Sequence, residues 1–250
     1  MSAALRPFWR YYGGKWRAAP RYPVPVYGTI VEPFAGAAGY ALRYPAHDVV
    51  LVDTYPVVTA IWQWLINVSV DEVMAIPEVD AIDELPAWVP QPARWLIGFQ
   101  FGGADHHPRA RLSTTYARAR RDDPMRYANL GWSARMRARI ARQVPAIRHW
   151  RVVTGDYTQA PAVTATWFID PPYSTAGRHY PRGATAVDYT ALAGWCRTRM
   201  GQVIVCESAG ATWLPFRPLY AARTAITASK PTTELVWVHQ TDAQESEGLK

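Results

Sequence analysis

The sequence predicts an α/β fold built around a parallel sheet, and two observations lead to this prediction. Short apolar runs rich in β-branched residues recur along the chain, and helix-length segments separate them. Each run ends in an acidic residue, and these residues are Glu32, Asp53, Asp170 and Glu207. The carboxyl ends of parallel strands meet at one edge of a sheet, where ligands bind. The sequence therefore favours an enzyme or a nucleotide-binding protein.

The first two predicted strands cover residues 29–32 and 49–53. Between them lies a turn of small residues, Glu32 to Gly39, from which we expect a helix beginning at Tyr40. Small residues let a backbone approach a ligand closely at a helix N-terminus. Asp53 follows this turn by about twenty residues, where an acidic side chain can accept hydrogen bonds from both ribose hydroxyls. Together these features predict a cofactor that contains adenosine.

The third predicted strand, residues 166–170, leads directly into Asp170, Pro171, Pro172 and Tyr173, and a fourth covers residues 202–207. Two consecutive prolines end a strand and form a turn. Proline has no N–H group, so carbonyls near the turn and the Asp170 carboxylate can accept hydrogen bonds from an amino group. Tyr173 offers an aromatic face for stacking on a planar base.

Positive charge is concentrated in one segment of the chain. The formal net charge is +7, yet residues 94–151 alone carry thirteen arginines, three acidic residues and no lysine. Arginine suits bidentate contact with phosphate groups and guanine edges, so this segment favours a nucleic-acid partner. An arginine-rich surface that only contacts solvent is the alternative.

Within that segment, Met136, Ile140, Val144 and Ile147 form an apolar stripe of helical spacing that predicts an amphipathic helix ending near Pro145. His106 and His107 are adjacent and lack a partner cluster, so we expect surface histidines and no metal site.

The two cysteines, Cys196 and Cys206, match neither a disulfide framework nor a zinc pattern, which favours a reducing compartment. The first fifteen residues lack the apolar core of a secretory signal, and the most apolar stretch, residues 49–70, is interrupted by polar residues. We expect a soluble cytoplasmic protein, in a bacterial, archaeal or phage context, with no membrane partner.

Five segments of the sequence, taken in chain order, resemble motifs of the Dam-type, or alpha-group, S-adenosylmethionine-dependent DNA adenine-N6 methyltransferases. The segment Tyr11 to Lys15 resembles the opening aromatic-Ala-Gly-Gly-Lys motif of the family, and Val31 to Gly36 its cofactor motif. Further along, residues 155–157 resemble its Gly-Asp-Phe segment, residues 170–173 its catalytic motif, and residues 234–237 its closing strand. Ala38 stands where many members have a second glycine, with Gly39 one place later.

The resemblance implies a Rossmann-like methyltransferase sheet with helices on both faces and a small, mainly helical target-recognition insert. It implies methyl transfer from S-adenosylmethionine to the N6 amino group of a flipped adenine in double-stranded DNA, as in restriction-modification systems. It assigns catalysis to Asp170, Pro171, Pro172 and Tyr173, with Asp170 and the Pro171 carbonyl accepting the amino hydrogens. It assigns cofactor binding to Tyr11, Lys15, Phe34, Gly36, Asp53, Asp156 and Asp170.

The expected domains are a catalytic domain of residues 1–93 and 152–240, the arginine-rich recognition insert of residues 94–151, and a polar tail of residues 241–250. The expected DNA contacts are Arg109, Arg111, Arg118, Arg120, Arg121 and Arg126. Cytosine-N4 methylation, RNA methylation and a catalytically silent DNA-binding relative stay open as alternatives. The recognition sequence and a partner endonuclease also stay open, as does the oligomeric state, for which a monomer is favoured.

Overall fold

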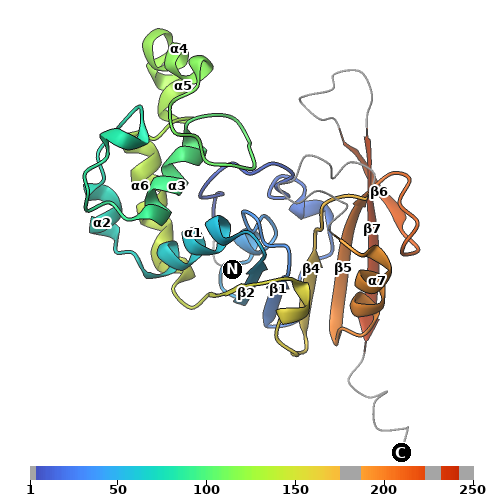
Figure 1. Ribbon diagram of the computed structural model, residues 1–250. Helices are drawn as coiled ribbons and strands as arrows, with labels where there is room; N and C mark the ends of the chain where they lie inside the picture. Colours follow the sequence, from blue (N-terminus) through green and yellow to red (C-terminus); the bar gives the residue numbers. More distant parts are fainter. Residues whose placement is uncertain (1–3, 175–186, 223–231, 242–250) are drawn as a thin grey trace, which may run out of the picture.

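The computed structural model describes residues 4–174, 187–222 and 232–241. In this part of the chain, a seven-stranded sheet has the order β3-β2-β1-β4-β5-β7-β6 (Figure 1). The strands are β1 (Thr29–Glu32), β2 (Asp48–Asp53), β3 (Arg151–Thr154), β4 (Ala165–Ile169), β5 (Gly201–Ser208), β6 (Arg217–Ala222) and β7 (Thr232–Thr241). Strands β1 to β5 pair in parallel, whereas β7 runs antiparallel to both β5 and β6.

The α/β prediction is confirmed, and the four predicted strands coincide with β1, β2, β4 and β5 to within one residue at each end. Residues 234–237 lie in β7, as the closing strand of the sheet. The polar tail lies outside the described residues after Thr241.

Side chains alternate between the two faces of the sheet, and each face has its own buried core. On one face, Leu51 and Phe168 pack with Trp62 of helix α1 (Pro56–Asn67). On the other, Val50 and Trp167 pack with Leu192 of helix α7 (Tyr189–Arg197). Helices therefore cover both faces of the sheet, as expected.

A helical region lies beside the β2 and β3 edge of the sheet (Figure 1). It contains α2 (Val70–Ala75), α3 (Gln91–Gln100), α4 (Thr114–Asp122), α5 (Pro124–Ala128) and α6 (Ala134–Gln143), with short 3₁₀ turns at Ile82–Glu84 and Val144–Ile147. Helix α2 packs against α6, and α3 packs against α1. Helix α6, which lies in the predicted recognition insert, therefore packs both against α5 of the insert and against α2, which precedes the insert's predicted start at residue 94.

Local sequence sets the helix starts in this region. Ser113, Asp123 and Ser133 precede α4, α5 and α6, and each side chain accepts a hydrogen bond from a backbone N–H in the first turn. Such caps satisfy amide groups that the helix itself leaves without acceptors. The predicted apolar stripe from Met136 to Ile147 is buried, and Pro145 lies in the 3₁₀ turn that follows α6.

The helix expected from Tyr40 is wrong. Only a single 3₁₀ turn, Ala41–Arg43, follows the small-residue turn. Pro45 disfavours helical geometry at Tyr44, which has a φ of −131° and a ψ of 53°. Strand β2 begins at Asp48, so the connection also has no room for a longer helix.

No helix in the described ranges is long and apolar enough to cross a membrane.

Candidate active site

A cavity of about 820 Å³ lies at the carboxyl ends of β1, β2, β3 and β4. Its wall combines the N-terminal segment, the small-residue turn after β1, and residues that follow the other three strands. The predicted site residues that line it are Tyr11, Lys15, Phe34, Gly36, Asp53, Asp156, Asp170 and Pro172. Pro171 and Tyr173 are not among the lining residues. The structure therefore brings together every predicted cofactor residue and two residues of the Asp-Pro-Pro-Tyr motif.

The turn after β1 takes a left-handed backbone at two positions. Gly36 has a φ of +44°, and a Cβ atom there would lie 3.1 Å from the Tyr11 ring. Ala38 has a φ of +49°, which an L-residue with a side chain rarely adopts.

Gly39 lets the N-terminal segment pack directly on this turn. A Cβ atom at Gly39 would lie 2.6 Å from the backbone N of Trp16 and 2.8 Å from that of Lys15. Only glycine leaves room for this approach, so the turn supports the segment that carries Lys15 into the cavity wall.

Asp53 joins the end of β2 to the same turn. One carboxylate oxygen accepts the Gly36 N–H at 2.9 Å, and the other accepts the Tyr55 N–H at 2.8 Å. Burial raises the pKa of Asp53, and these two amides oppose the rise. Each oxygen keeps a further lone pair, so the carboxylate can still accept hydrogen bonds from a ligand.

Two aromatic rings stand near the end of β3. Phe34 and Tyr157 are stacked with centroids 5.8 Å apart and planes 27° from parallel. Asp156, which precedes Tyr157, is exposed, and its carboxylate accepts the Thr158 N–H at 2.8 Å. This end of the cavity offers flat apolar surfaces beside a carboxylate.

Asp170 and Lys15 form an ion pair in the wall of the cavity. The Lys15 Nζ lies 2.8 Å from Oδ1 of Asp170, and their side chains are 10% and 17% exposed. Burial raises the pKa of Asp170 to about 6, with Lys15 opposing the rise and Glu234 and Glu207 adding to it. The ammonium also lies 4.6 Å from the centre of the Tyr173 ring and donates to the Gly13 carbonyl at 3.1 Å.

Contacts from three other elements hold the chain after Asp170. The Tyr189 hydroxyl donates to the Pro172 carbonyl, and the Tyr173 hydroxyl donates to Glu234. The Ser174 N–H donates to the buried Glu207 carboxylate at 3.0 Å. In the described part of the chain, no donor reaches the Pro171 carbonyl.

Glu32 is a further buried acid in the cavity wall. Its side chain accepts the Ala41 N–H at 2.6 Å, and burial raises its pKa to about 8 although that hydrogen bond opposes the rise. Glu32 is therefore largely protonated at neutral pH.

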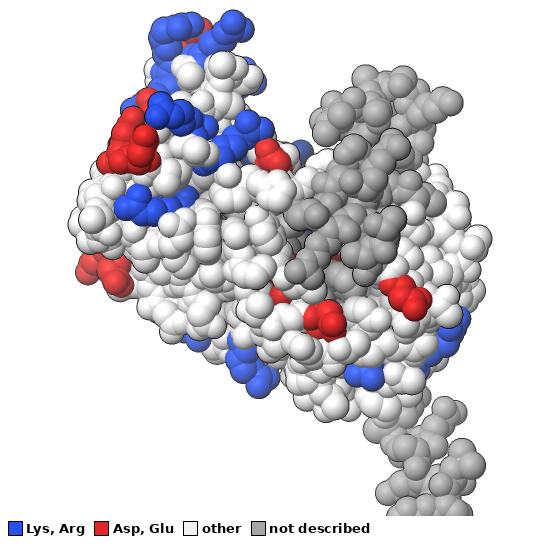
Figure 2. Space-filling view, viewed as in Figure 1, with Lys and Arg blue, Asp and Glu red and all other residues white. Residues whose placement is uncertain are grey.

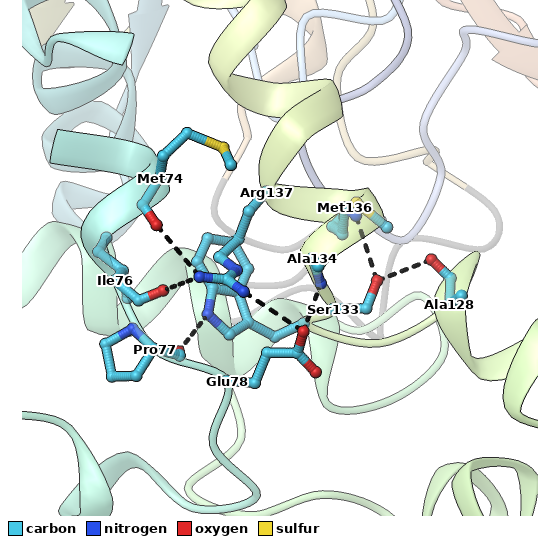
Figure 3. A network of polar contacts seen from close by, with 10 residues as sticks. Met74, Ile76, Pro77, Glu78, Ala128, Ser133, Ala134, Met136 and Arg137 are labelled. Carbon is cyan, nitrogen blue, oxygen red and sulfur yellow. Dashed lines mark hydrogen bonds and ion pairs between the residues drawn. The ribbon is translucent and has the colours of Figure 1, made fainter. Parts of the chain in front are cut away.

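Several arginines of the 94–151 segment stabilise the fold. Arg137 donates to the carbonyls of Met74 and Ile76 and contacts the Glu78 carboxylate at 3.3 Å (Figure 3). Arg94 donates to four backbone carbonyls between residues 82 and 89. The net charge of the segment thus overstates the charge that is free to contact a partner.

The six predicted DNA-contact arginines fall into two groups. Four are ion-paired, in the pairs Arg109–Asp105, Arg111–Asp83, Arg120–Asp80 and Arg121–Asp122. Arg118 and Arg126 are exposed and have no acidic partner among the described residues. Basic side chains gather over α4 and α5 at the tip of the helical region (Figure 2).

Sequence reasoning missed several residues that hold the site. The three buried glutamates all lie in segments that the sequence marks as strands, Glu32 in β1, Glu207 in β5 and Glu234 in β7. For Glu32 and Glu207, the position at the carboxyl end of a predicted strand indicates a place near the cavity. Tyr22 and Tyr189 carried no signal, because only the folded chain brings their hydroxyls to Glu234 and to the Pro172 carbonyl.

Cys196 and Cys206 are buried free thiols, and burial raises the pKa of each. Across the described ranges, no group of three His, Cys, Asp or Glu side chains could hold a metal ion.

No family model and no curated protein matches this chain. One solved structure with similarity to the chain is a SAM-dependent methyltransferase from Neisseria gonorrhoeae. The match has 14% identity and a TM-score of 0.35, and it covers 94% of this chain and 68% of the other. The strand order and the lining of the cavity are features of this chain that do not depend on the match.

Proposed function

We propose that this chain is an S-adenosylmethionine-dependent methyltransferase that modifies the N6 amino group of a flipped adenine in double-stranded DNA. The observation that carries the proposal is the cavity in which Asp53 and Asp170, from β2 and β4, flank the small-residue turn of β1. These three adjacent strands supply a ribose acceptor, a close-approach turn and an amino-group acceptor at one sheet edge.

The residues present fit the cofactor. Asp53 can accept the ribose hydroxyls, and Phe34 and Tyr157 offer apolar surface for the adenine ring. A volume of about 820 Å³ lies in the range of small-molecule sites.

When bound, S-adenosylmethionine supplies an electrophilic methyl group on a sulfur that leaves with the bonding electron pair. The chain's own task is to hold the adenine amino group, whose lone pair is otherwise delocalised into the ring. Asp170 accepts one amino hydrogen, and the Pro171 carbonyl, which no donor of the described residues reaches, accepts the other; this directs electron density to the nitrogen. The proton that the nitrogen loses after transfer passes through Asp170 to water.

Tyr173 provides the stacking surface for the base. In the present structure the Lys15 ammonium lies 4.6 Å from the centre of that ring and 2.8 Å from Asp170. Binding of the base to the same ring face and carboxylate therefore requires the Lys15 side chain to move.

The DNA contacts are assigned to α4 and α5 at the tip of the helical region. Arg118 and Arg126 have no acidic partner among the described residues. Arg120 and Arg121 of α4, and Arg109 and Arg111 in the loop before it, have partly exposed ion pairs that phosphate groups can replace. The tip is tied to the cavity by Arg10, which precedes Tyr11. Its guanidinium donates to the Tyr116 hydroxyl at 2.7 Å and to the Leu130 carbonyl at 2.9 Å.

The test is transfer of labelled methyl groups to three substrates, which are unmethylated plasmid, the same sequence as single strands, and its RNA transcript. Label in N6-methyladenine from the duplex supports the proposal. Label only in RNA, or in N4-methylcytosine, replaces it with the corresponding alternative. Cofactor binding without transfer to any of the three indicates a silent relative.

A further inference from the structure

We propose that Glu234 is a positioning residue, which orients Tyr173 and attracts Lys15 beside the amino-group acceptor Asp170. This inference rests on the proposed function of Asp170. It adds a residue from β7, which lies two strands away from β4 in the sheet, beyond β5.

The carboxylate of Glu234 is an acceptor shared by two hydroxyl groups. Its Oε1 accepts the Tyr22 hydroxyl at 2.6 Å and also the Tyr173 hydroxyl. Glu234 is 8% exposed, so water cannot easily replace either donor. Hydrogen bonds to a buried charged group are among the stronger ones in proteins. The Tyr173 ring is therefore fixed from its hydroxyl end, which orients the face proposed for stacking.

Glu234 also shares a cation with Asp170. The Lys15 Nζ lies 3.8 Å from Glu234 and 2.8 Å from Asp170, so one ammonium stands between two carboxylates. A buried carboxylate is stable only when it is paired or hydrogen-bonded, and Lys15 is the cation that the described residues place near Glu234. The attraction to Glu234 gives Lys15 a second carboxylate to approach when it leaves Asp170.

The same arrangement sets the charge around Asp170. The charged and titratable groups that face Asp170 and Glu234 from the surrounding elements are Lys15, Tyr22, Glu32, Tyr173, Cys206, Glu207 and Tyr220. Glu234 itself and Glu207 add to the rise of the Asp170 pKa, and Lys15 opposes it. Removal of the Glu234 charge should lower the pKa of Asp170 for two reasons. It removes a negative charge that raises this pKa, and it leaves the Lys15 ammonium to interact with Asp170 alone.

The experiment compares Glu234→Gln, Tyr173→Phe and the double variant in single-turnover methyl transfer from pH 5 to 9. The glutamine keeps an oxygen acceptor and removes the charge, whereas the phenylalanine keeps the ring and removes the hydroxyl. We expect each single variant to lose about tenfold in rate, and the double variant to fall no more than about twofold below the slower single variant, because both abolish the same charge-assisted hydrogen bond between Tyr173 and Glu234. Additive losses would overturn the shared role. Glu72→Gln, an exposed helix-cap glutamate, is the matched control.

A second measurement needs no activity. Carbon-13 NMR of the aspartate carboxyls follows the titration of Asp170, which is assigned by the signal lost in Asp170→Asn. We expect the Asp170 pKa in Glu234→Gln to fall below the wild-type value, and the acidic limb of the rate profile to move with it. An unchanged Asp170 titration together with a lower melting temperature would show a merely structural role.

The two proposals fail in different ways. If the wild type transfers no methyl group to DNA, the proposed function fails, while the NMR titration still tests the link between Glu234 and Asp170. If Glu234→Gln does not fold, Tyr173→Phe alone decides the positioning claim, and a rate within about twofold of wild type contradicts it.

Discussion

The Lys15 ammonium bridges the N-terminal segment and the end of β4, 2.8 Å from the Asp170 carboxylate. The two residues are 155 positions apart in the sequence, and the close packing of Gly39 against the backbone of Lys15 and Trp16 brings them together. In the proposed reaction the adenine amino group takes the place of this ammonium on Asp170. The pair therefore couples the protonation of Asp170 to the position of Lys15.

Replacing Lys15 with methionine should raise the pKa of Asp170 above about 6, because the cation that opposes the effect of burial is lost. Asp170 would then be protonated over a wider pH range, and the rate of methyl transfer should fall more at pH 6 than at pH 8.5. A rate profile with the wild-type shape at a uniformly lower level would show that Lys15 acts only in binding.

The buried Glu32 should make stability depend on pH. Its pKa is raised to about 8, so the folded protein holds this proton more tightly than the unfolded chain does. The resulting stabilisation is full below the unfolded value near 4.5 and is lost as the pH rises through about 8. Each unit of pKa difference corresponds to about 1.4 kcal/mol.

Glu32→Gln, which resembles the protonated acid, should therefore flatten the decline of the unfolding free energy between pH 5 and pH 8.5. Urea titrations at both values measure it, with the exposed Asp71→Asn as control. An unchanged decline in Glu32→Gln would contradict the assignment of this proton.

Removing Arg118 and Arg126 together, as alanine, should weaken DNA binding and reduce the slope of log affinity against log salt by about two. The melting temperature should stay unchanged, since both side chains are exposed and lack acidic partners in the described ranges. Arg197→Ala, on the exposed face of α7 and far from α4 in Figure 1, controls for net charge. An unchanged slope in the double variant favours a surface that only contacts solvent.

Arg94→Met should lower stability and leave DNA binding unchanged, the opposite of the result expected for Arg118 and Arg126. Its guanidinium donates to the carbonyls of Ile82, Leu85, Pro86 and Val89, and the methionine would leave these carbonyls without that donor. We expect a loss of about 1 to 3 kcal/mol in the free energy of unfolding and no change in the salt slope. Full stability with weakened DNA binding would move Arg94 into the DNA interface.

Gly39→Ala should reduce the affinity for S-adenosylmethionine by about tenfold or more, because the new Cβ atom would lie 2.6 Å from the backbone N of Trp16 and displace the segment that carries Lys15. Isothermal calorimetry measures the affinity. Gly28→Ala, which meets no atom within 4 Å, is the matched control. Equal affinity in the two variants would show that the packing of this segment does not shape the cavity.

The sheet and many residues of the cavity wall could be predicted because their signals are local. Continuous β-branched runs mark β1, β2, β4 and β5, and the acidic residues at or just after their ends mark the edge at which the cavity forms. The helix predicted from Tyr40 does not form, because Pro45 disfavours helical geometry at the residue before it.

The remaining features depend on contacts between distant segments. Whether an arginine is available to DNA is decided by the carbonyls that the fold brings to it, as with Arg94 and Arg137. The hydroxyl of Tyr22 reaches Glu234 across 212 positions of sequence, and no local pattern announces such a contact.

The most direct measurement of the central claim is the identity of the base methylated by the wild type and by Asp170→Ala. Both proteins are incubated with labelled S-adenosylmethionine and unmethylated plasmid, and the DNA is digested to nucleosides. We predict label in N6-methyladenine for the wild type and none for Asp170→Ala, which should still bind the plasmid. Turnover of Asp170→Ala near the wild-type rate, or label in methylated cytosine, would contradict the account.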